Sequence, residues 1–240
     1  MDQAVIFENV GKSYGRQQIL SSIDLSITNG EYLGLVGVNG AGKTTLINCM
    51  LDFTSIDSGA ISIFDKDHTQ TITRERLAYL PEKFTPPYYL TGQDFLVYMT
   101  RLYRVPYDPI NVDRLLSILD LDPSALEKPV RQFSKGMSQK LGLAACLLSN
   151  KDLLIMDEPM SGLDPKARAY LKQHLLDLKK QGQTLFFSTH LLSDVEALCD
   201  RVAILHQGKI QFSGSPDECC EHFGTDDFEQ AYLNCVGGGK

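Results

Sequence analysis

The stretch Gly37-Val-Asn-Gly-Ala-Gly-Lys-Thr44 matches the pattern G-x-x-x-x-G-K-[ST], in which backbone amides and one lysine surround a phosphate group. It stands between an apolar run at 32–36, typical of a buried strand, and a helical pattern that continues to about Leu51. In this setting the glycines let backbone N–H groups turn inward, and the helix N-terminus favours anions. The sequence therefore predicts a nucleotide-phosphate site.

Within this loop, each polar residue type has an expected partner. We expect Lys43 to place its ammonium on the terminal phosphates and the Thr44 hydroxyl to ligate Mg²⁺. The residues of this segment assigned to ATP binding are Gly37, Asn39, Gly40, Ala41, Gly42, Lys43, Thr44 and Thr45.

A second candidate lies at the end of another apolar strand, 153–156, which runs into Asp157 and Glu158. Two adjacent carboxylates at a strand tip are costly to bury without a cation, so we assign Asp157 to Mg²⁺, held through water. Glu158 is then available to orient or deprotonate the attacking water. The alternative, that the acidic pair only caps the turn before Pro159, is disfavoured beside a phosphate loop.

Strand-like runs alternate with helical patterns, which predicts an α/β protein with a P-loop NTPase core and a mostly parallel sheet. Alternating apolar residues at 23–28 indicate an antiparallel β subdomain, whereas the unbroken run at 153–156 indicates a strand buried on both faces. The expected strands are 4–9, 23–28, 32–36, 60–64, 77–80, 153–156, 184–188, 201–206 and 209–213.

Strand signals vanish between Pro81 and Asn150, where three helices are expected at about 91–103, 112–119 and 134–148. We therefore expect one domain over residues 1–240. Its parts are a catalytic core at about 1–81 and 151–215, a helical insert at about 82–150 and a C-terminal helical tail at about 216–240.

The composition is that of a globular protein, with 43% hydrophobic and 22% charged residues and a net charge of −7. A negative chain has no global attraction for nucleic acid, so we expect no such partner. No run approaches the ~18–20 apolar residues of a spanning helix, and the N-terminus lacks a secretory signal, which predicts a cytoplasmic location. The scattered cysteines suit reduced thiols, and Cys219, Cys220 and His222 offer too few ligands for structural zinc.

The segment Phe133-Ser-Lys-Gly-Met137 opens an amphipathic helix and resembles the signature motif of ATP-binding cassette (ABC) proteins, usually written L-S-G-G-Q. Ser134 and Gly136 keep the positions that meet nucleotide in that family, whereas Lys135 and Met137 depart from the consensus. The resemblance covers about residues 4–215. It implies that Ser134, Gly136 and Met137 contact an ATP molecule bound to another chain.

The resemblance assigns further residues by position. Tyr14 stands at the place of the aromatic that stacks on adenine, and His190 looks like the catalytic switch histidine that contacts the γ-phosphate. Asp164, in Ser-Gly-Leu-Asp, looks like a dimer contact, and Glu82 replaces a usual glutamine that senses metal, so it is assigned to Mg²⁺. The open alternatives are that Tyr14 covers a sheet edge, His190 is structural, Ser134 is only a helix cap and Glu82 is a solvated loop residue.

The resemblance also implies an ATPase that uses ATP and Mg²⁺ and couples hydrolysis to transport. Two cassettes, identical or homologous, would close over two ATP molecules and drive a separate transmembrane permease docked near Glu82 and residues 86–90, at the cytoplasmic face of the membrane. The sequences Tyr-Leu-Pro-Glu and Phe-Ser-Lys-Gly-Met resemble those in the cassettes of two-component exporters more than those in the cassettes of importers. The alternative is a soluble, non-transport ABC ATPase that acts on another macromolecule.

Overall fold

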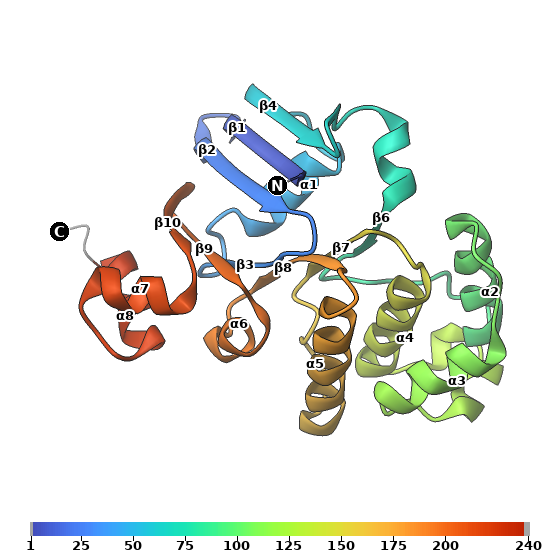
Figure 1. The fold of residues 1–240 in the computed structure, drawn as a ribbon. Coiled ribbons are helices and arrows are strands. Elements are labelled where there is room, and N and C mark those ends of the chain that lie inside the picture. The colour runs from blue at the N-terminus through green and yellow to red at the C-terminus, as the bar shows by residue number, and fades with distance from the viewer. Residues whose placement is uncertain (1, 238–240) are drawn as a thin grey trace.

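A computed structural model describes residues 2–237, and in it two sheets and a set of helices form stacked layers (Figure 1). The smaller sheet is antiparallel with strand order β2-β1-β4-β5, and the larger central sheet has the order β10-β9-β3-β8-β7-β6. The smaller sheet consists of β1 (Gln3–Tyr14), β2 (Gln17–Thr28), β4 (Ser58–Ile63) and β5 (Lys66–Asp67). The central sheet consists of β3 (Tyr32–Val36), β6 (Leu77–Leu80), β7 (Leu153–Asp157), β8 (Thr184–Thr189), β9 (Arg201–His206) and β10 (Lys209–Gly214).

The middle of the central sheet is parallel, because β6, β7, β8, β3 and β9 pair side by side in the same direction. Every residue of β3, β7 and β8 is buried, as expected for apolar strands covered on both faces. The carboxyl ends of these strands meet at one edge of the sheet. In the register, Asp157 lies opposite Ser188 and Val36 lies opposite Thr189.

The antiparallel sheet begins with a long hairpin whose strands exceed the predicted runs 4–9 and 23–28. A two-residue turn at Gly15-Arg16 joins β1 to β2, so that Tyr14 lies opposite Gln17. Several register shifts interrupt the pairing, and Asn9 within β1 has a φ of 50°. These bulges break the two-residue alternation, which is the signal on which the sequence prediction depended.

The helices of the insert begin where their capping residues stand, and they lie close to the predicted positions. They are α2 (Gly92–Tyr103), α3 (Pro109–Ile118) and α4 (Lys135–Leu148). Thr91 and Asp94 form a capping box at the start of α2, and the Ser134 hydroxyl caps α4. The start of α3 comes three residues before the predicted one, since Asp108 caps it and Pro109 suits the first turn.

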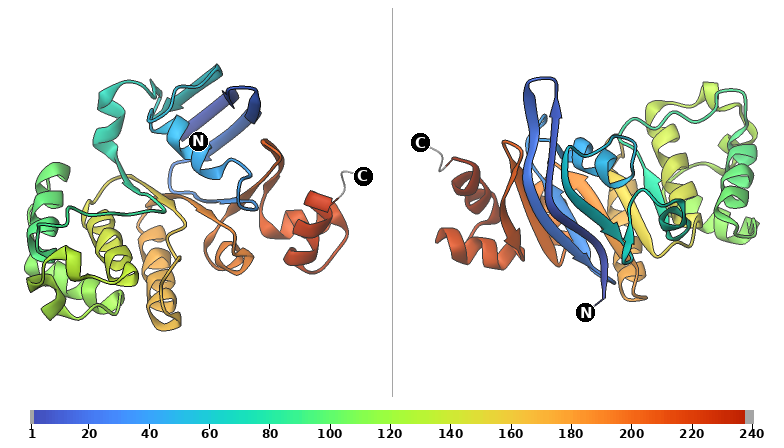
Figure 2. Two further views of the ribbon diagram at one scale, coloured as in Figure 1. Left: turned by 180° about the vertical axis from the view of Figure 1, so that it is seen from behind. Right: turned by 90° about the horizontal axis from the view of Figure 1, so that it is seen from above.

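The remaining helices surround the central sheet. They are α1 (Lys43–Met50), α5 (Pro165–Lys179), α6 (Leu192–Leu198), α7 (Pro216–Phe223) and α8 (Phe228–Gly237). The insert and the α7–α8 pair lie at opposite ends of the molecule (Figure 2). The predicted helical tail contains α7 and α8, and its residues 238–240 lie outside the described residues.

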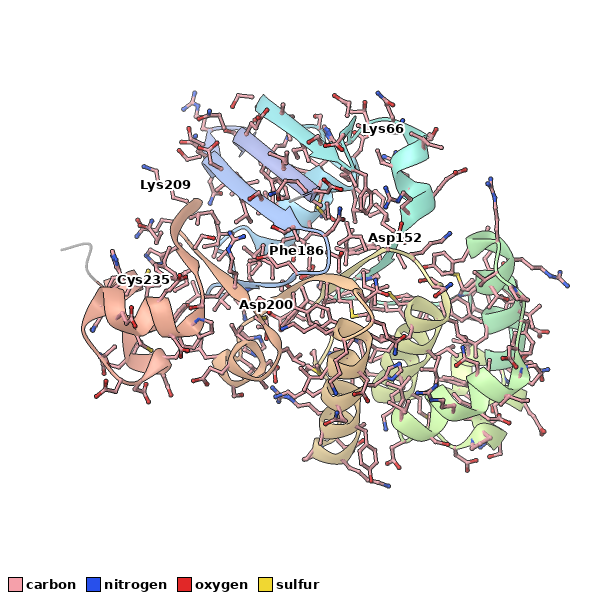
Figure 3. All side chains as sticks on the ribbon, in the orientation of Figure 1. Lys66, Asp152, Phe186, Asp200, Lys209 and Cys235 are labelled. Carbon is pink, nitrogen blue, oxygen red and sulfur yellow. The ribbon has the colours of Figure 1, made fainter. Side chains whose placement is uncertain are left out.

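Three apolar clusters pack against the central sheet in the described structure, and the two largest lie on its opposite faces. Phe186 of β8 points into the cluster shared with the antiparallel sheet and α1, where its ring centroid lies 6.5 Å from that of Phe7 (Figure 3). Its neighbour Phe187 points into the other cluster, among the helices of the insert and α5. Within residues 2–237, no helix combines the length and apolarity needed to cross a membrane.

We expect Phe186→Ala to lower the free energy of unfolding by about 3–5 kcal/mol, because it leaves a cavity between the two sheets. Ile110→Ala is the control, since this side chain is 82% exposed at the start of α3. Urea unfolding followed by circular dichroism measures both variants. Equal midpoints for Phe186→Ala and the control would contradict the packing role of Phe186.

Candidate functional site

A cavity of about 570 Å³ lies at the carboxyl edge of the central sheet. Its walls come from segments that follow β3, β6, β7 and β8, together with the end of the β1–β2 hairpin. This edge is where open α/β sheets generally bind ligands. The lining residues are Tyr14, Gln17, Ile19, Asn39, Gly40, Gly42, Lys43, Thr44, Thr45, Glu82, Asp157, Glu158, Ser161 and His190.

The loop between β3 and α1 is tightly placed by its glycines. Gly42, with a φ of 111°, is the N-cap of α1, and a Cβ atom at Gly37 would lie 2.4 Å from the Leu205 carbonyl oxygen on β9. Gly37 and Ala41 therefore hold the loop against its neighbours and do not line the cavity. In the described structure the first turn of α1 has no acidic residue and no side-chain cap, so its amides remain available to an anion.

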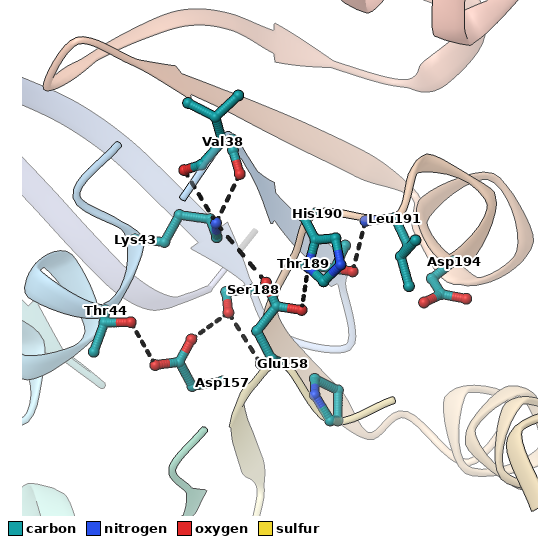
Figure 4. Close-up of polar contacts among 12 residues, drawn as sticks. Val38, Lys43, Thr44, Asp157, Glu158, Ser188, Thr189, His190, Leu191 and Asp194 are labelled. Atoms are coloured by element: carbon teal, nitrogen blue, oxygen red, sulfur yellow. Dashed lines mark hydrogen bonds and ion pairs between the residues drawn. The ribbon is translucent and has the colours of Figure 1, made fainter. Parts of the chain in front are cut away.

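Lys43 is buried, with its ammonium turned back toward the loop (Figure 4). Its Nζ donates to the Gly37 carbonyl at 2.7 Å and lies 3.8 Å from Glu158 Oε1. Burying a cation is costly, and negative phosphate oxygens would compensate for that cost. The position of Lys43 therefore fits the terminal phosphates of a nucleotide.

The carboxylate of Asp157 is buried and accepts hydrogen bonds from two hydroxyl groups. Thr44 Oγ1 donates to Asp157 Oδ2 at 2.8 Å, and the Ser188 hydroxyl donates to Oδ1 (Figure 4). Within residues 2–237, no lysine, arginine or histidine forms an ion pair with Asp157. A buried carboxylate beside a threonine hydroxyl is an oxygen donor set that a hard divalent cation prefers.

The described residues contain no group of three or more histidine, cysteine or acidic side chains that could hold a metal ion by themselves. Cys219, Cys220 and His222 on α7 do not form such a group either. The donor set at Asp157 therefore fits Mg²⁺ in particular, because Mg²⁺ commonly takes one or two protein oxygens and completes its shell with phosphates and water.

Glu158 follows Asp157 and has a left-handed backbone, with a φ of 52°. Its N–H is held by the carbonyl and the hydroxyl of Ser188, at 3.2 and 3.1 Å. This turn directs the side chain toward His190, whose Nδ1 lies 2.9 Å from Glu158 Oε2 (Figure 4). A carboxylate so oriented, next to the metal carboxylate, can position and deprotonate a water molecule.

Glu82 is exposed on the loop after β6 and lines the same cavity. The charges of Glu82 and Asp157 both act on the hydroxyl group of Tyr79, on β6. Burial raises the pKa of the Tyr79 hydroxyl above its usual range, and the charges of Asp157 and then Glu82 raise this pKa further. Direct contact between Glu82 and a metal stays a prediction.

Tyr14 ends β1 at the mouth of the cavity, with its side chain half exposed. The hairpin turn brings Gln17 and Ile19 beside it, and neither was predicted. Ser188 was missed as well, because its contact with Asp157 depends on the register of β8 against β7. Stacking of Tyr14 on a nucleotide base stays a prediction.

The predicted signature residues do not reach this cavity. Ser134, Gly136 and Met137 line a separate one of about 460 Å³, together with Gly162 and Asp164. The Ser134 hydroxyl accepts the Met137 N–H at 3.1 Å, so the helix cap exists, and a cap is compatible with anion binding. Within one chain, the phosphate loop and the signature are thus parts of different cavities.

The loop that joins Glu158 to α5 lies against the signature helix. Gln139 Nε2 donates to the Pro159 carbonyl at 3.3 Å, and Lys140 Nζ donates to Asp164 Oδ2 at 2.8 Å. The Ala167 amide and then the Lys140 ammonium lower the pKa of Asp164 to about 2. Asp164 is therefore engaged within its own chain, and its contact with a second chain stays a prediction.

Comparison with known proteins agrees with this geometry. Residues 20–161 match the family described as ABC transporter. The chain belongs to the ABC transporter family. It is similar to the uncharacterized ABC transporter ATP-binding protein sll0415 of Synechocystis, with 39% identity over 200 residues that cover 82% of this chain and 56% of that protein. It is also similar to the Nod factor export ATP-binding protein I of Sinorhizobium fredii, with 32% identity over 90% of this chain and 64% of that protein.

This ABC chain thus spans between half and two thirds of the length of these two relatives. A solved structure described as the ATP-binding subunit of an ABC transporter matches over nearly the full length, covering 97% of this chain and 99% of its own. The TM-score is 0.88 at 29% identity. The predicted family and the α/β fold class are confirmed.

We expect Ser188→Ala to raise the Mg²⁺ concentration needed for half-maximal ATP binding by about 10–100-fold, the usual effect of removing a partner of a metal ligand. The reason is that Asp157 and the Glu158 amide both lose a contact. Binding of a fluorescent ATP analogue, titrated with Mg²⁺, provides the measurement. Ser193→Ala on α6, outside the cavity, is the control, and superimposable curves for the two variants would refute the role.

Proposed function

We propose that this chain is the ATP-binding and ATP-hydrolysing subunit of an ABC transporter and that it drives a separate transmembrane permease. One observation carries the proposal: Lys43, the Thr44–Asp157 pair and the Glu158–His190 pair converge on a single cavity. The groups that we assign to phosphate binding, metal binding and water activation therefore line one cavity and can act on one substrate. Membership of the ABC transporter family supports ATP as that substrate.

The chain's own residues account for the steps of hydrolysis. Loop amides and Lys43 hold the β- and γ-phosphates, and Thr44 and Asp157 would hold Mg²⁺. When bound, Mg²⁺ supplies positive charge that stabilises the charge developing on the phosphate oxygens. Glu158 accepts a proton from the attacking water, and His190 keeps the Glu158 carboxylate in place through its Nδ1 contact.

The two separate cavities support a sandwich dimer. Ser134 and Gly136 stand at the N-terminus of α4, where a serine hydroxyl and helix amides suit a γ-phosphate, but they line a different cavity from their own phosphate loop. A second copy of the chain, or a homologous cassette, can present its signature to this loop and receive the same in return. A two-fold axis completes both sites at once.

The direction of transport that we propose is export. Support comes from the Nod factor export relative and from the wording around Glu82 and the signature. The permease would dock on the insert near residues 82–90, which places the chain at the cytoplasmic face of the membrane. We propose one cassette over residues 1–240, with its core at about 1–81 and 151–215, the insert at about 82–150 and the tail from about 216.

Glu158→Gln keeps the side-chain volume and removes the base, so we expect the hydrolysis rate to fall about 10²–10⁴-fold. ATP and Mg²⁺ can still bind both chains, and the variant should therefore accumulate as a dimer. Size-exclusion chromatography with light scattering, in the presence of Mg-ATP, measures this. Glu196→Gln on α6 is the matched control, and a Glu158→Gln variant that stays monomeric would contradict the sandwich.

Glu82→Gln should retain hydrolysis but weaken the dependence of ATP binding on Mg²⁺, because the carboxylate attracts the cation and repels the γ-phosphate when metal is absent. Titrating Mg²⁺ against ATP binding tests this directly. Glu127→Gln makes the same change at an exposed site of the insert. Identical curves for wild type and Glu82→Gln would mean that the side chain does not reach the metal.

A further inference from the structure

Asp194, in the first turn of α6, is a charged residue that hydrolysis as described above does not use. Its carboxylate is completely buried, and it follows His190 closely in the sequence (Figure 4). Burying a carboxylate is costly unless charged partners surround it. The partners of Asp194 and its place beside His190 therefore indicate what it does.

The partners of Asp194 come from α5. Arg168 forms a fork with the carboxylate, in which Nε donates to Oδ1 at 3.1 Å and Nη2 donates to Oδ2 at 2.5 Å. Lys172 Nζ, one turn further along α5, lies 2.6 Å from Oδ1 and also donates to the Ser193 carbonyl at 3.3 Å. A paired guanidinium fixes the direction of a carboxylate as well as its distance. We call Arg168, Lys172 and Asp194 the α5–α6 clamp.

The position of α6 depends on contacts with its neighbours, because the helix has only seven residues and is too short to be stable alone. Its N-cap, Leu191, makes no side-chain capping hydrogen bond in the described structure. Toward the central sheet, Val195 packs so closely on Gly34 of β3 that an added Cβ atom would lie 3.2 Å from it. Apolar packing has little directional preference. The clamp therefore supplies the orientation of the first turn.

The first turn of α6 controls the backbone at His190. The Leu191 N–H donates to the Thr189 hydroxyl at 3.0 Å, so a tight turn joins the end of β8 to α6 (Figure 4). The His190 side chain is half exposed, and within residues 2–237 its hydrogen bond is the one with Glu158. The direction of the ring is therefore set mainly by the backbone between β8 and α6.

The clamp completes a closed set of contacts around the proposed base. The loop that follows Glu158 leads to Asp164, whose carboxylate caps α5. Arg168, in the next turn of α5, pairs with Asp194. The chain before α6 then returns to His190, which contacts Glu158. Glu158 is thus held from two directions, and the clamp is the polar contact that joins them.

We propose that Asp194 is a positioning residue for ATP hydrolysis, which acts through His190 to keep Glu158 directed at the attacking water. In the described structure, none of the three clamp residues lines the nucleotide cavity. Loss of the clamp should therefore slow the chemical step and leave the affinity for ATP nearly unchanged. This inference rests on the proposed function and adds to it how the histidine of the site is oriented.

The first experiment replaces the carboxylate with an amide of the same shape. Asp194→Asn should lower kcat for ATP hydrolysis about tenfold, because small displacements of a catalytic group are costly, and should change KM by less than about twofold. Asp177→Asn is the matched control, since this exposed carboxylate pairs with Lys180 at the other end of α5. Equal kcat values for the two variants, or a rise in KM without a fall in kcat, would overturn the proposal.

The second experiment uses a milder variant, because removing one partner of a buried ion pair can also destabilise the fold. Arg168→Lys keeps the positive charge but cannot form the fork, so kcat should fall about threefold at unchanged KM. Thermal unfolding followed by circular dichroism identifies a temperature at which every variant is folded, and the assays are run there. An unchanged kcat in folded Arg168→Lys would overturn the proposal even if Asp194→Asn does not fold.

The third experiment tests whether Asp194 acts through His190. Single-turnover hydrolysis of γ-labelled ATP, which resolves low rates, compares His190→Ala with His190→Ala/Asp194→Asn. The two rates should agree within about twofold, since Asp194 has no ring left to orient. If the second substitution slows His190→Ala by the same factor as it slows the wild type, Asp194 acts independently of His190. That result would overturn the proposal.

Failure of this inference is distinguishable from failure of the proposed function. Absence of ATP hydrolysis in the wild-type chain would contradict the proposed function. Hydrolysis in the wild type, with equal rates in Asp194→Asn and Asp177→Asn, would contradict only the role of Asp194.

Discussion

The arrangement of the cavity at the carboxyl edge of the central sheet depends on the hydrogen bonds that the buried carboxylate of Asp157 accepts. It ends β7 and accepts one hydroxyl from Thr44, in the first turn of α1, and another from Ser188, near the end of β8. Three segments far apart in the sequence are thereby held at one edge of the sheet. Because Asp157 is shielded from water, these hydroxyls are strong determinants of its position, and Glu158, the next residue, is held by Ser188 too.

From this point, contacts extend across the chain to the signature helix. The segment after Glu158 lies against α4. There the Pro159 carbonyl accepts a hydrogen bond from Gln139, and the Asp164 carboxylate accepts one from Lys140. A Cβ atom at Gly136 would lie 3.1 Å from the Gly162 carbonyl, so the backbones also approach closely. One short loop thus connects Glu158, the proposed base, with the cavity that we propose faces a second chain.

Much of the site was predictable because its signals are local in the sequence. The phosphate loop, Asp157 and Glu158 each follow an apolar strand, and parallel strands bring such tips together without knowledge of their register. Ser188, Gln17 and the Tyr79 hydroxyl were not predictable in this way, since their roles depend on register and on bulges in β1.

The division of the binding residues between two cavities of one chain has a genetic consequence. In the proposed dimer, each complete site takes its phosphate loop from one copy and its signature from the other. A copy with a defective phosphate loop can still form a dimer. The site built from that loop and the signature of a healthy copy is then inactive. When the two kinds of chain mix at random, pairs with two complete sites decline with the square of the healthy fraction, whereas each mixed pair keeps one complete site.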